Sequence, residues 1–230
     1  MTTPPPIPPP KNGASTAFEP FAFKSRYVYR DTGGFLCHLP PAYNVGWKLH
    51  VVKPSSLTTN SRLPKDYQNL LGALRARHIP HKIVGDLGAL TQMEKNPLQV
   101  GKFITIYPEA EEELISVLDL INNCIDKDAM SFTTAPKDLP VSCKGIVGAR
   151  WGGLTSAYTV NAQNELVDDD RSRSHPDWIR NPFDPASRGA DGWVVFRDDQ
   201  KMQVLARDFK TGGVREFGGE ISREASYQSE

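Results

Sequence analysis

Residues 46–52, with the sequence GWKLHVV, constrain the fold of this chain more than any other stretch. Apolar and polar residues alternate along them, which is the pattern of a β-strand with two different faces. The apolar residues would face the core, while Lys48 and His50 share the other face, about 7 Å apart along the backbone. An amine and an imidazole so placed suit proton transfer beside an anion. They would equally fit a solvated strand face with two ordinary polar residues.

A strand–helix–strand succession is expected to begin with this stretch. Pro64 is typical of a first helical turn, and the apolar stripe of that helix would consist of Tyr67, Leu70, Leu71 and Leu74. A short strand at residues 81–84 (HKIV) comes next. It should lie near the first strand, because consecutive elements usually neighbour one another. This arrangement would bring Lys82 close to Lys48 and His50.

A third strand, at residues 101–107 (GKFITIY), leads into the clearest helix of the chain. Pro108 opens this helix, and glutamates fill its first turn, where the helix dipole favours negative charge. Five positions separate Lys102 from Tyr107, so on a regular strand they point to opposite faces. Either a bulge intervenes or only one of them lies on the face of Lys48. The second helix has an apolar, core-forming face made by Leu114, Val117, Leu118, Ile121 and Ile125.

Residues 144–153 (KGIVGARWGG) are typical of a strand interrupted by glycines. Gly148, Gly152 and Gly153 would let the backbone approach a ligand closely. Arg150 lies among them and is a candidate anion clamp. The alternative, a surface arginine paired with a carboxylate, is equally compatible with the sequence.

The C-terminal third of the chain predicts a long polar loop followed by a hairpin. Residues 161–191 are polar and irregular, and long loops in compact domains are usually functional or disordered. Two β-like runs, 193–196 and 202–205, would pair through a turn at 198–201.

The length of 230 residues is enough for one large domain with extensions. We expect a disordered proline-rich tail at residues 1–15, a single domain at residues 16–217 that includes the hairpin, and a flexible tail at residues 218–230. Lysine plus arginine and aspartate plus glutamate number 27 each, so the net charge is zero. This balance argues against an electrostatic grip on nucleic acid or an anionic membrane.

The chain has the features of a cytoplasmic protein without a metal site. It contains neither an apolar run long enough to span a bilayer nor a signal-peptide pattern. Its three cysteines, Cys37, Cys124 and Cys143, are widely spaced and form no ligand cluster with histidine. Reduced thiols are therefore expected, with neither metal nor organic cofactor.

Three segments in order, GWKLHV, HKIV after a helix, and GKFITIYP before an acidic-headed helix, resemble a known enzyme family. The order resembles the lyase domain of lanthipeptide synthetases of the lyase–kinase–cyclase type. It is similar, more distantly, to the phosphothreonine lyases among type III secretion effectors. The VGARWGG and RNPF segments extend the resemblance, which covers roughly residues 35 to 185. It implies an α+β fold like that of phosphothreonine lyases, with twisted, mainly antiparallel sheets and flanking helices.

Such enzymes remove phosphate from phosphoserine or phosphothreonine by β-elimination and leave dehydroalanine or dehydrobutyrine, without a metal or organic cofactor. The resemblance implies that Lys82 is the general base for the α-proton and that His50 is the general acid for the departing phosphate oxygen. Lys48 would be the cation beside the reacting carbonyl and phosphate. Tyr107 would position these catalytic groups.

The same resemblance implies that Arg150 and Lys102 bind the substrate phosphate. The expected partners are a phosphorylated precursor peptide, a separate Ser/Thr kinase and a cyclase. Residues 204–213 resemble the start of a kinase lobe only faintly. Two alternatives stay open: an effector-like phosphothreonine lyase that acts on a host protein kinase, and a non-catalytic phosphopeptide-binding subunit. The binding subunit would need neither Lys82 nor His50.

Overall fold

The computed structural model describes most of the expected domain. The described residues are 30–31, 34–41, 43, 45–54, 57, 63–125, 137–142, 145–154, 158–161, 166–179, 181–184, 193–198, 203–208 and 214–217. The tails expected at residues 1–15 and 218–230 lie outside them, as do Cys143 and most of the turn expected at residues 198–201.

The chain folds as an α+β protein around an antiparallel sheet, which confirms the expected fold class. Its helices are α1 (Lys65–Ala76), α2 (Leu87–Lys95) and α3 (Glu111–Cys124). The main sheet runs in the order β1-β2-β4-β5-β3-β10-β11-β12, and β7 pairs with β3 and carries β6; β8 and β9 form a separate pair. The strands are β1 (Arg30–Asp31), β2 (Phe35–His38), β3 (Val45–Val51), β4 (His81–Val84), β5 (Ile104–Ile106), β6 (Leu139–Pro140), β7 (Val147–Gly153), β8 (Tyr158–Val160), β9 (Leu166–Asp168), β10 (Trp193–Asp198), β11 (Gln203–Asp208) and β12 (Val214–Phe217).

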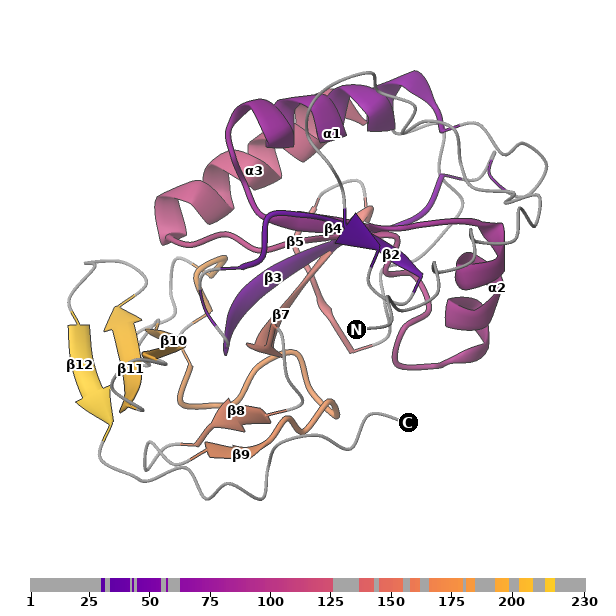
Figure 1. Ribbon diagram of the computed structural model, residues 1–230. Helices are drawn as coiled ribbons and strands as arrows, with labels where there is room; N and C mark the ends of the chain where they lie inside the picture. The colour runs from indigo at the N-terminus through magenta and orange to yellow at the C-terminus, as the bar shows by residue number, and fades with distance from the viewer. Residues whose placement is uncertain are drawn as a thin grey trace, which may run out of the picture.

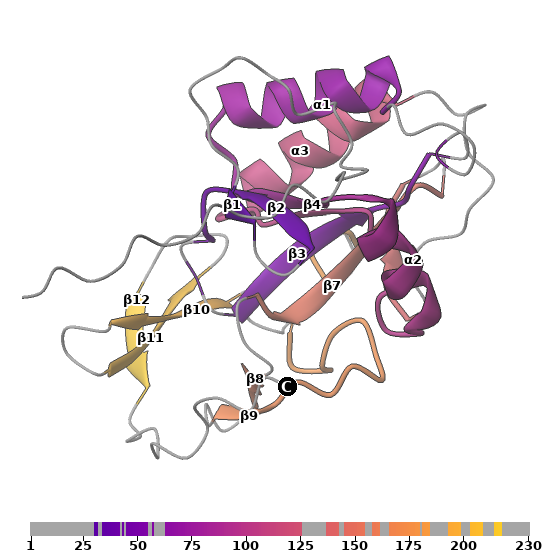
Figure 2. The same ribbon diagram turned by 45° about the vertical axis from the view of Figure 1, so that its right-hand side comes forward.

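Helices α1 and α3 lie side by side on one face of the sheet (Figures 1 and 2). The stripe predicted for α1 is confirmed, because all four of its residues are buried. On α3, Leu114, Val117 and Ile121 are buried, while Leu118 packs against the core and Ile125 is buried just past the helix end. None of the helices in the described part of the chain has the length and hydrophobicity that crossing a bilayer requires.

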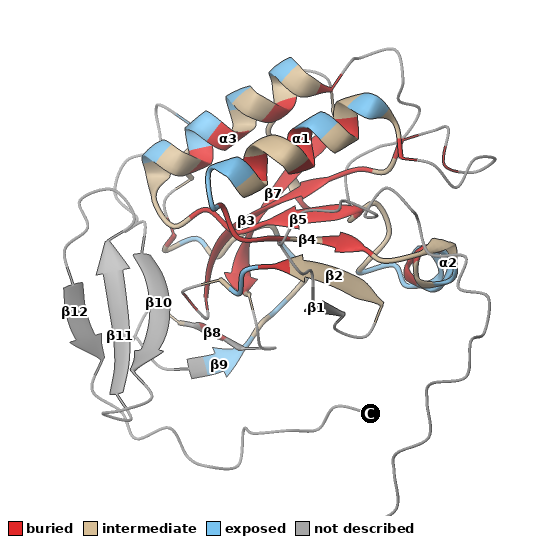
Figure 3. Cartoon of the chain, turned by 45° about the horizontal axis from the view of Figure 1, so that its top comes forward, coloured by how far each residue is buried: buried red, intermediate tan, exposed pale blue. Residues whose placement is uncertain are grey.

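Strand β3 is the centre of the molecule, and all seven of its residues are buried. Leu49 and Val51 belong to the hydrophobic core. In Figure 3, β3, β5 and β7 are coloured as buried beneath α1 and α3. Lys48 and His50 alternate with Leu49 and Val51 and therefore point to the face that α1 and α3 leave uncovered.

Strand β4 lies near β3 as expected, with β5 between the two strands. The expectation of an interrupted strand changes. Strand β7 runs without interruption from Val147 to Gly153 despite its glycines. The hairpin is confirmed in the pairing of β10 with β11, to which β12 adds a further strand, and the expected long loop contains β9.

Candidate active site

A single row of cross-strand partners carries the centre of the site. Lys82 on β4 pairs with Thr105 on β5, and Thr105 in turn pairs with His50 on β3. Paired residues on antiparallel strands point to the same face, so these three side chains lie together. Each pair brings two Cα atoms to about 5 Å from each other. The Cα atoms of Lys82 and His50 are therefore about 10 Å apart, with Thr105 between them.

A second row lies two residues further along the strands. Lys48 on β3 pairs with Arg150 on β7. Tyr107 follows the end of β5, and its backbone N–H donates to the carbonyl oxygen of Pro80 at 2.9 Å. Tyr107 is two residues from Thr105, so it shares that face.

Both rows open into a cavity of about 300 Å³. All six residues implied by the resemblance line it. The complete lining is Phe35, Lys48, His50, Lys82, Gln99, Lys102, Thr105, Tyr107, Arg150, Gly153, Leu154 and Arg171. The conflict expected between Lys102 and Tyr107 does not arise. Strand β5 begins only at Ile104, and Lys102 reaches the cavity from the preceding turn, where its Nζ donates to the Leu98 carbonyl oxygen at 2.6 Å.

His50 is held by a buried carboxylate that sequence reasoning missed. Its Nδ1 lies 2.5 Å from Oδ2 of Asp138, and both side chains are almost fully buried. Burial lowers the pKa of His50 to about 4, and the Asp138 charge and hydrogen bond oppose that shift in part. Because Asp138 occupies Nδ1, Nε2 is the ring nitrogen left for the cavity.

The cavity lysines are held in surroundings that favour their neutral forms. Burial lowers the pKa of Lys48 to about 7, with Asp169 opposing and nearby cations adding to the shift. Burial also lowers the pKa of Lys102 to about 8. The pKa of Lys82 is lowered by burial, against an opposing effect of Cys37. Lys82 also places its Nζ 4.3 Å from the centre of a phenyl ring, that of Phe35.

Lys48 and Tyr107 complete the polar wall of the cavity. Lys48 donates from Nζ to the carbonyl oxygen of Gly153 at 2.5 Å. Burial raises the pKa of Tyr107 well above its usual range, so its hydroxyl stays neutral and can donate a hydrogen bond.

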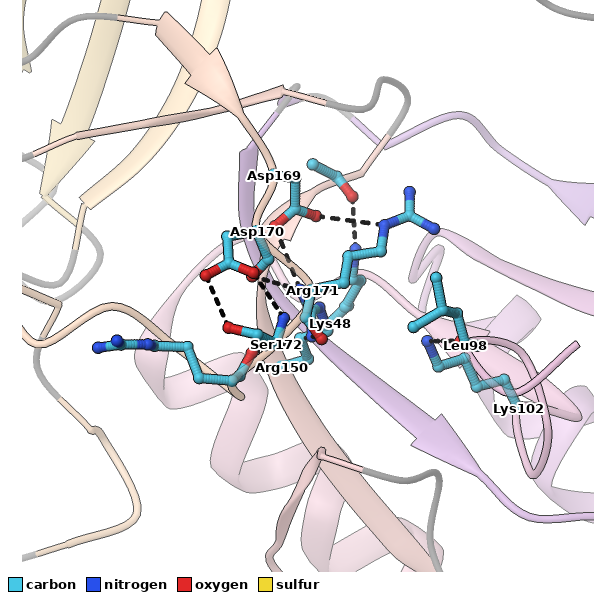
Figure 4. Close-up of polar contacts among 10 residues, drawn as sticks. Lys48, Leu98, Lys102, Arg150, Asp169, Asp170, Arg171 and Ser172 are labelled. Carbon is cyan, nitrogen blue, oxygen red and sulfur yellow. Dashed lines mark hydrogen bonds and ion pairs between the residues drawn. The ribbon is translucent and has the colours of Figure 1, made fainter.

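Arg150 is buried and holds the segment of residues 169–173, hereafter the arginine-held segment. Its Nη1 donates to the carbonyl oxygens of Arg171 at 3.3 Å and Arg173 at 2.9 Å. Its Nη2 donates to Oδ1 of Asp169 at 3.2 Å and to the carbonyl oxygen of Asp170 at 3.3 Å (Figure 4). The expected carboxylate partner is therefore present, but the arginine is 3% exposed and lines the cavity rather than the surface.

Two glycines of β7 serve carboxylates rather than a ligand, which corrects the expectation from the sequence. A Cβ on Gly148 would lie 2.8 Å from the Cβ of Asp138, and a Cβ on Gly152 would lie 2.6 Å from Oδ2 of Asp169. Their missing side chains give the two carboxylates room against the strand. Of the three glycines, Gly153 lines the cavity itself.

Sequence reasoning missed Asp138, Asp169, Thr105 and Arg171. Thr105 was within reach, because it alternates with Tyr107 on an expected strand. The other three lie in irregular segments whose approach to β3 and β7 has no periodic signal. In the described part of the chain, no three His, Cys, Asp or Glu side chains are grouped so that they could hold a metal ion.

Residues 29–192 match the family model of the RamC N-terminal domain. The chain belongs to this family. The RamC N-terminal domain family is a lanthipeptide biosynthesis family, in agreement with the resemblance drawn from the sequence. The match includes every residue that lines the cavity, and β10, β11 and β12 lie beyond it. No curated protein matches the chain.

Proposed function

We propose that this protein is a phosphoserine/phosphothreonine lyase of lanthipeptide biosynthesis. It would eliminate phosphate from a phosphorylated precursor peptide and leave dehydroalanine or dehydrobutyrine. The observation that carries the proposal is the placement of Lys82 and His50 on either side of Thr105 in one cavity. A base and an acid separated by the width of one residue suit removal of a proton from one carbon and a leaving group from the next.

The charge of the cavity supports a phosphorylated substrate. Three lysines and two arginines line it, and Asp138 and Asp169 are the carboxylates paired with its residues. The excess of positive charge suits a phosphate group, which carries about −1.5 to −2 at neutral pH.

The reaction would begin at Lys82. Its neutral amine takes the α-proton, and the electron pair released forms the double bond between Cα and Cβ. The bond from Cβ to the phosphate oxygen breaks, and the phosphate leaves with the electron pair of this Cβ–O bond. Lys48 would stabilise the negative charge that develops on the neighbouring carbonyl oxygen. Burial and neighbouring positive charge both favour the neutral amine that the first step requires.

His50 would protonate the departing phosphate oxygen from Nε2. With a pKa of about 4 it is neutral in the free protein at pH 7. A bound phosphate dianion favours the protonated form of a nearby imidazole, as the Asp138 carboxylate already does. We therefore propose that His50 gains its proton as the phosphopeptide binds. The acid would then be ready only in the complex. The same dianion favours the protonated form of Lys82, which burial and the charge of Arg171 oppose.

The other cavity residues would support binding and orientation. Lys102 would contact the phosphate directly as a point charge. Arg150 would contribute positive charge while its terminal nitrogens hold the arginine-held segment. Tyr107 would orient the reacting groups through its neutral hydroxyl. A Ser/Thr kinase in the cytoplasm would have to supply the phosphopeptide, and a cyclase would consume the product.

A phosphopeptide-binding subunit without catalysis is the second candidate. The surplus of cations would serve it equally well, whereas it would need no base beside an acid. An effector-like lyase that acts on a host protein kinase would use the same chemistry on another substrate. The precursor-peptide proposal is favoured because the chain belongs to a lanthipeptide biosynthesis family.

Mass spectrometry of phosphoserine and phosphothreonine peptides incubated with the protein and a chelator tests the proposal. We expect loss of the elements of phosphoric acid, absent in Lys82→Ala and strongly reduced in His50→Ala. Lys95→Ala, at an exposed lysine on α2, is the matched control and should react normally. A product with its hydroxyl restored would identify a phosphatase and refute the mechanism. Binding without any change of mass would favour the binding subunit.

A further inference from the structure

The arginine-held segment is built to hold one conformation. Besides the four hydrogen bonds from Arg150, Ser172 donates from its backbone N–H and its hydroxyl to the Asp170 carboxylate, at 2.8 and 2.6 Å. Just beyond the segment, the backbone N–H of Trp151 donates to the Ser174 carbonyl oxygen at 2.8 Å. A polar stretch without regular secondary structure is thus fixed against β7 along its whole length.

Arg171 is the residue of this segment whose side chain enters the cavity. Its Nε lies 3.8 Å from Oδ2 of Asp169, and its side chain is 35% exposed. Its terminal nitrogens donate no hydrogen bond to any of the described residues. In Figure 4 the Arg171 guanidinium extends past the Asp169 carboxylate, on the side on which Lys102 lies.

Arg171 influences all three cavity lysines. Its charge lowers the pKa of Lys48, of Lys82 and of Lys102. The charge of Arg150 contributes to the shifts of Lys48 and Lys102. The guanidinium of Arg171 therefore lines the cavity within electrostatic reach of all three lysines.

We propose that Arg171 supplies the guanidinium that grips the substrate phosphate, and that Arg150 is a positioning residue that holds the segment carrying Arg171. This inference rests on the proposed phosphopeptide substrate. Asp169 contacts Arg171 at Nε and leaves both terminal nitrogens for two parallel hydrogen bonds to phosphate oxygens. A guanidinium offers that planar fork, which the cavity lysines cannot provide.

The different roles of Arg150 and Arg171 follow from the hydrogen bonds that each arginine makes. Both terminal nitrogens of Arg150 already donate to the arginine-held segment, so a direct phosphate contact from them would release the segment. Among the described residues, Arg171 has only a long contact with Asp169 to release. Binding through Arg171 therefore costs no internal hydrogen bond.

Calorimetric titration with inorganic phosphate, a phosphoserine peptide and its unphosphorylated form tests this assignment. We expect Arg171→Gln to weaken binding of phosphate and phosphopeptide about 10- to 100-fold, as loss of charge-assisted hydrogen bonds does, with an unchanged melting temperature. Arg171→Lys should recover part of the loss. The matched control is Arg173→Gln, on the same segment but outside the cavity, which should bind normally.

Arg150→Gln should lower the melting temperature and phosphate binding together, because it frees the segment. The assignment is overturned if Arg171→Gln binds phosphate like the wild type, or if the wild type does not bind phosphate at all. It is also overturned if Arg150→Lys melts normally and loses more binding than Arg171→Gln. Arg171-dependent binding without elimination would support the assignment and refute the lyase instead.

Discussion

Replacing Gly148 by alanine should disable His50 without altering any residue of the cavity. The new Cβ would lie 2.8 Å from the Cβ of Asp138 and 3.1 Å from its Oδ2. Carbon atoms pack at about 3.5–4.0 Å, so Asp138 must move by about 0.7–1.2 Å. The contact of 2.5 Å between Asp138 and His50 would then exceed the length of a charge-assisted hydrogen bond, which is about 2.7–2.9 Å.

The expected result is a large fall in kcat with a small change in KM. General acid catalysis contributes about 10²–10⁴-fold, and a histidine without its orienting partner loses most of that contribution. Among the described residues, Asp138 has one hydrogen-bond partner, His50, which contacts its Oδ2. The other carboxylate oxygen, Oδ1, has no partner among these residues. Losing the contact should therefore also cost about 1–3 kcal/mol of folding free energy.

Phosphate release from a phosphopeptide measures kcat, urea unfolding measures the folding free energy, and NMR titration of His50 reports its contact with Asp138. Gly72→Ala is the control, because a Cβ there meets nothing closer than 3.9 Å. This control should raise stability by about 0.5–1 kcal/mol, as removal of a helical glycine does, and leave kcat unchanged. In an Asp138→Gly background the clash disappears, so Gly148→Ala should have no further effect. A normal kcat in Gly148→Ala, or an equal further loss in that background, would refute the reasoning.

Three other variants follow from the same geometry. Lys82→Arg places a permanent positive charge where the mechanism needs a neutral amine, so phosphopeptide binding should persist while elimination falls at least about 10²-fold by mass spectrometry. Gly152 has a φ of 148°, which is strained for alanine, and a Cβ there would clash with the Asp169 carboxylate. Gly152→Ala should therefore lower the melting temperature and weaken phosphate binding in calorimetry. His81 is fully buried, and burial lowers its pKa to about 4, so the unfolded chain binds more protons below pH 6.5. The contribution of His81 to stability should therefore fall by about 3 kcal/mol from pH 6.5 to pH 4. Urea unfolding of His81→Gln should show a loss smaller by that amount over this pH range, and His78→Gln, at an exposed site, is the control.

The parts of the fold that sequence periodicity dictates were predictable. The stripe on α1, the buried face of α3 and the strand around Lys48 each bury the residues that their spacing selects. Periodicity does not determine which strands become neighbours. The placement of β5 between β3 and β4 depends on the packing of the whole sheet, and it was this placement that aligned Lys82 with His50.

The site illustrates the same limit more sharply. Residues on strands were predictable because alternation fixes their face, whereas Asp138 and the arginine-held segment reach the cavity through irregular backbone. Their positions were nevertheless encoded in β7, since Gly148 and Gly152 leave room for a carboxylate on either side of Arg150. On a strand whose one face alternates glycine, arginine and glycine, the glycines are therefore better interpreted as space for two carboxylates from loops than as space for a ligand. The two carboxylates lie on either side of the buried arginine. In a related sequence, a GxRxG strand beside a Lys-x-His strand predicts that two loop carboxylates, equivalent to Asp138 and Asp169, lie against the two glycines.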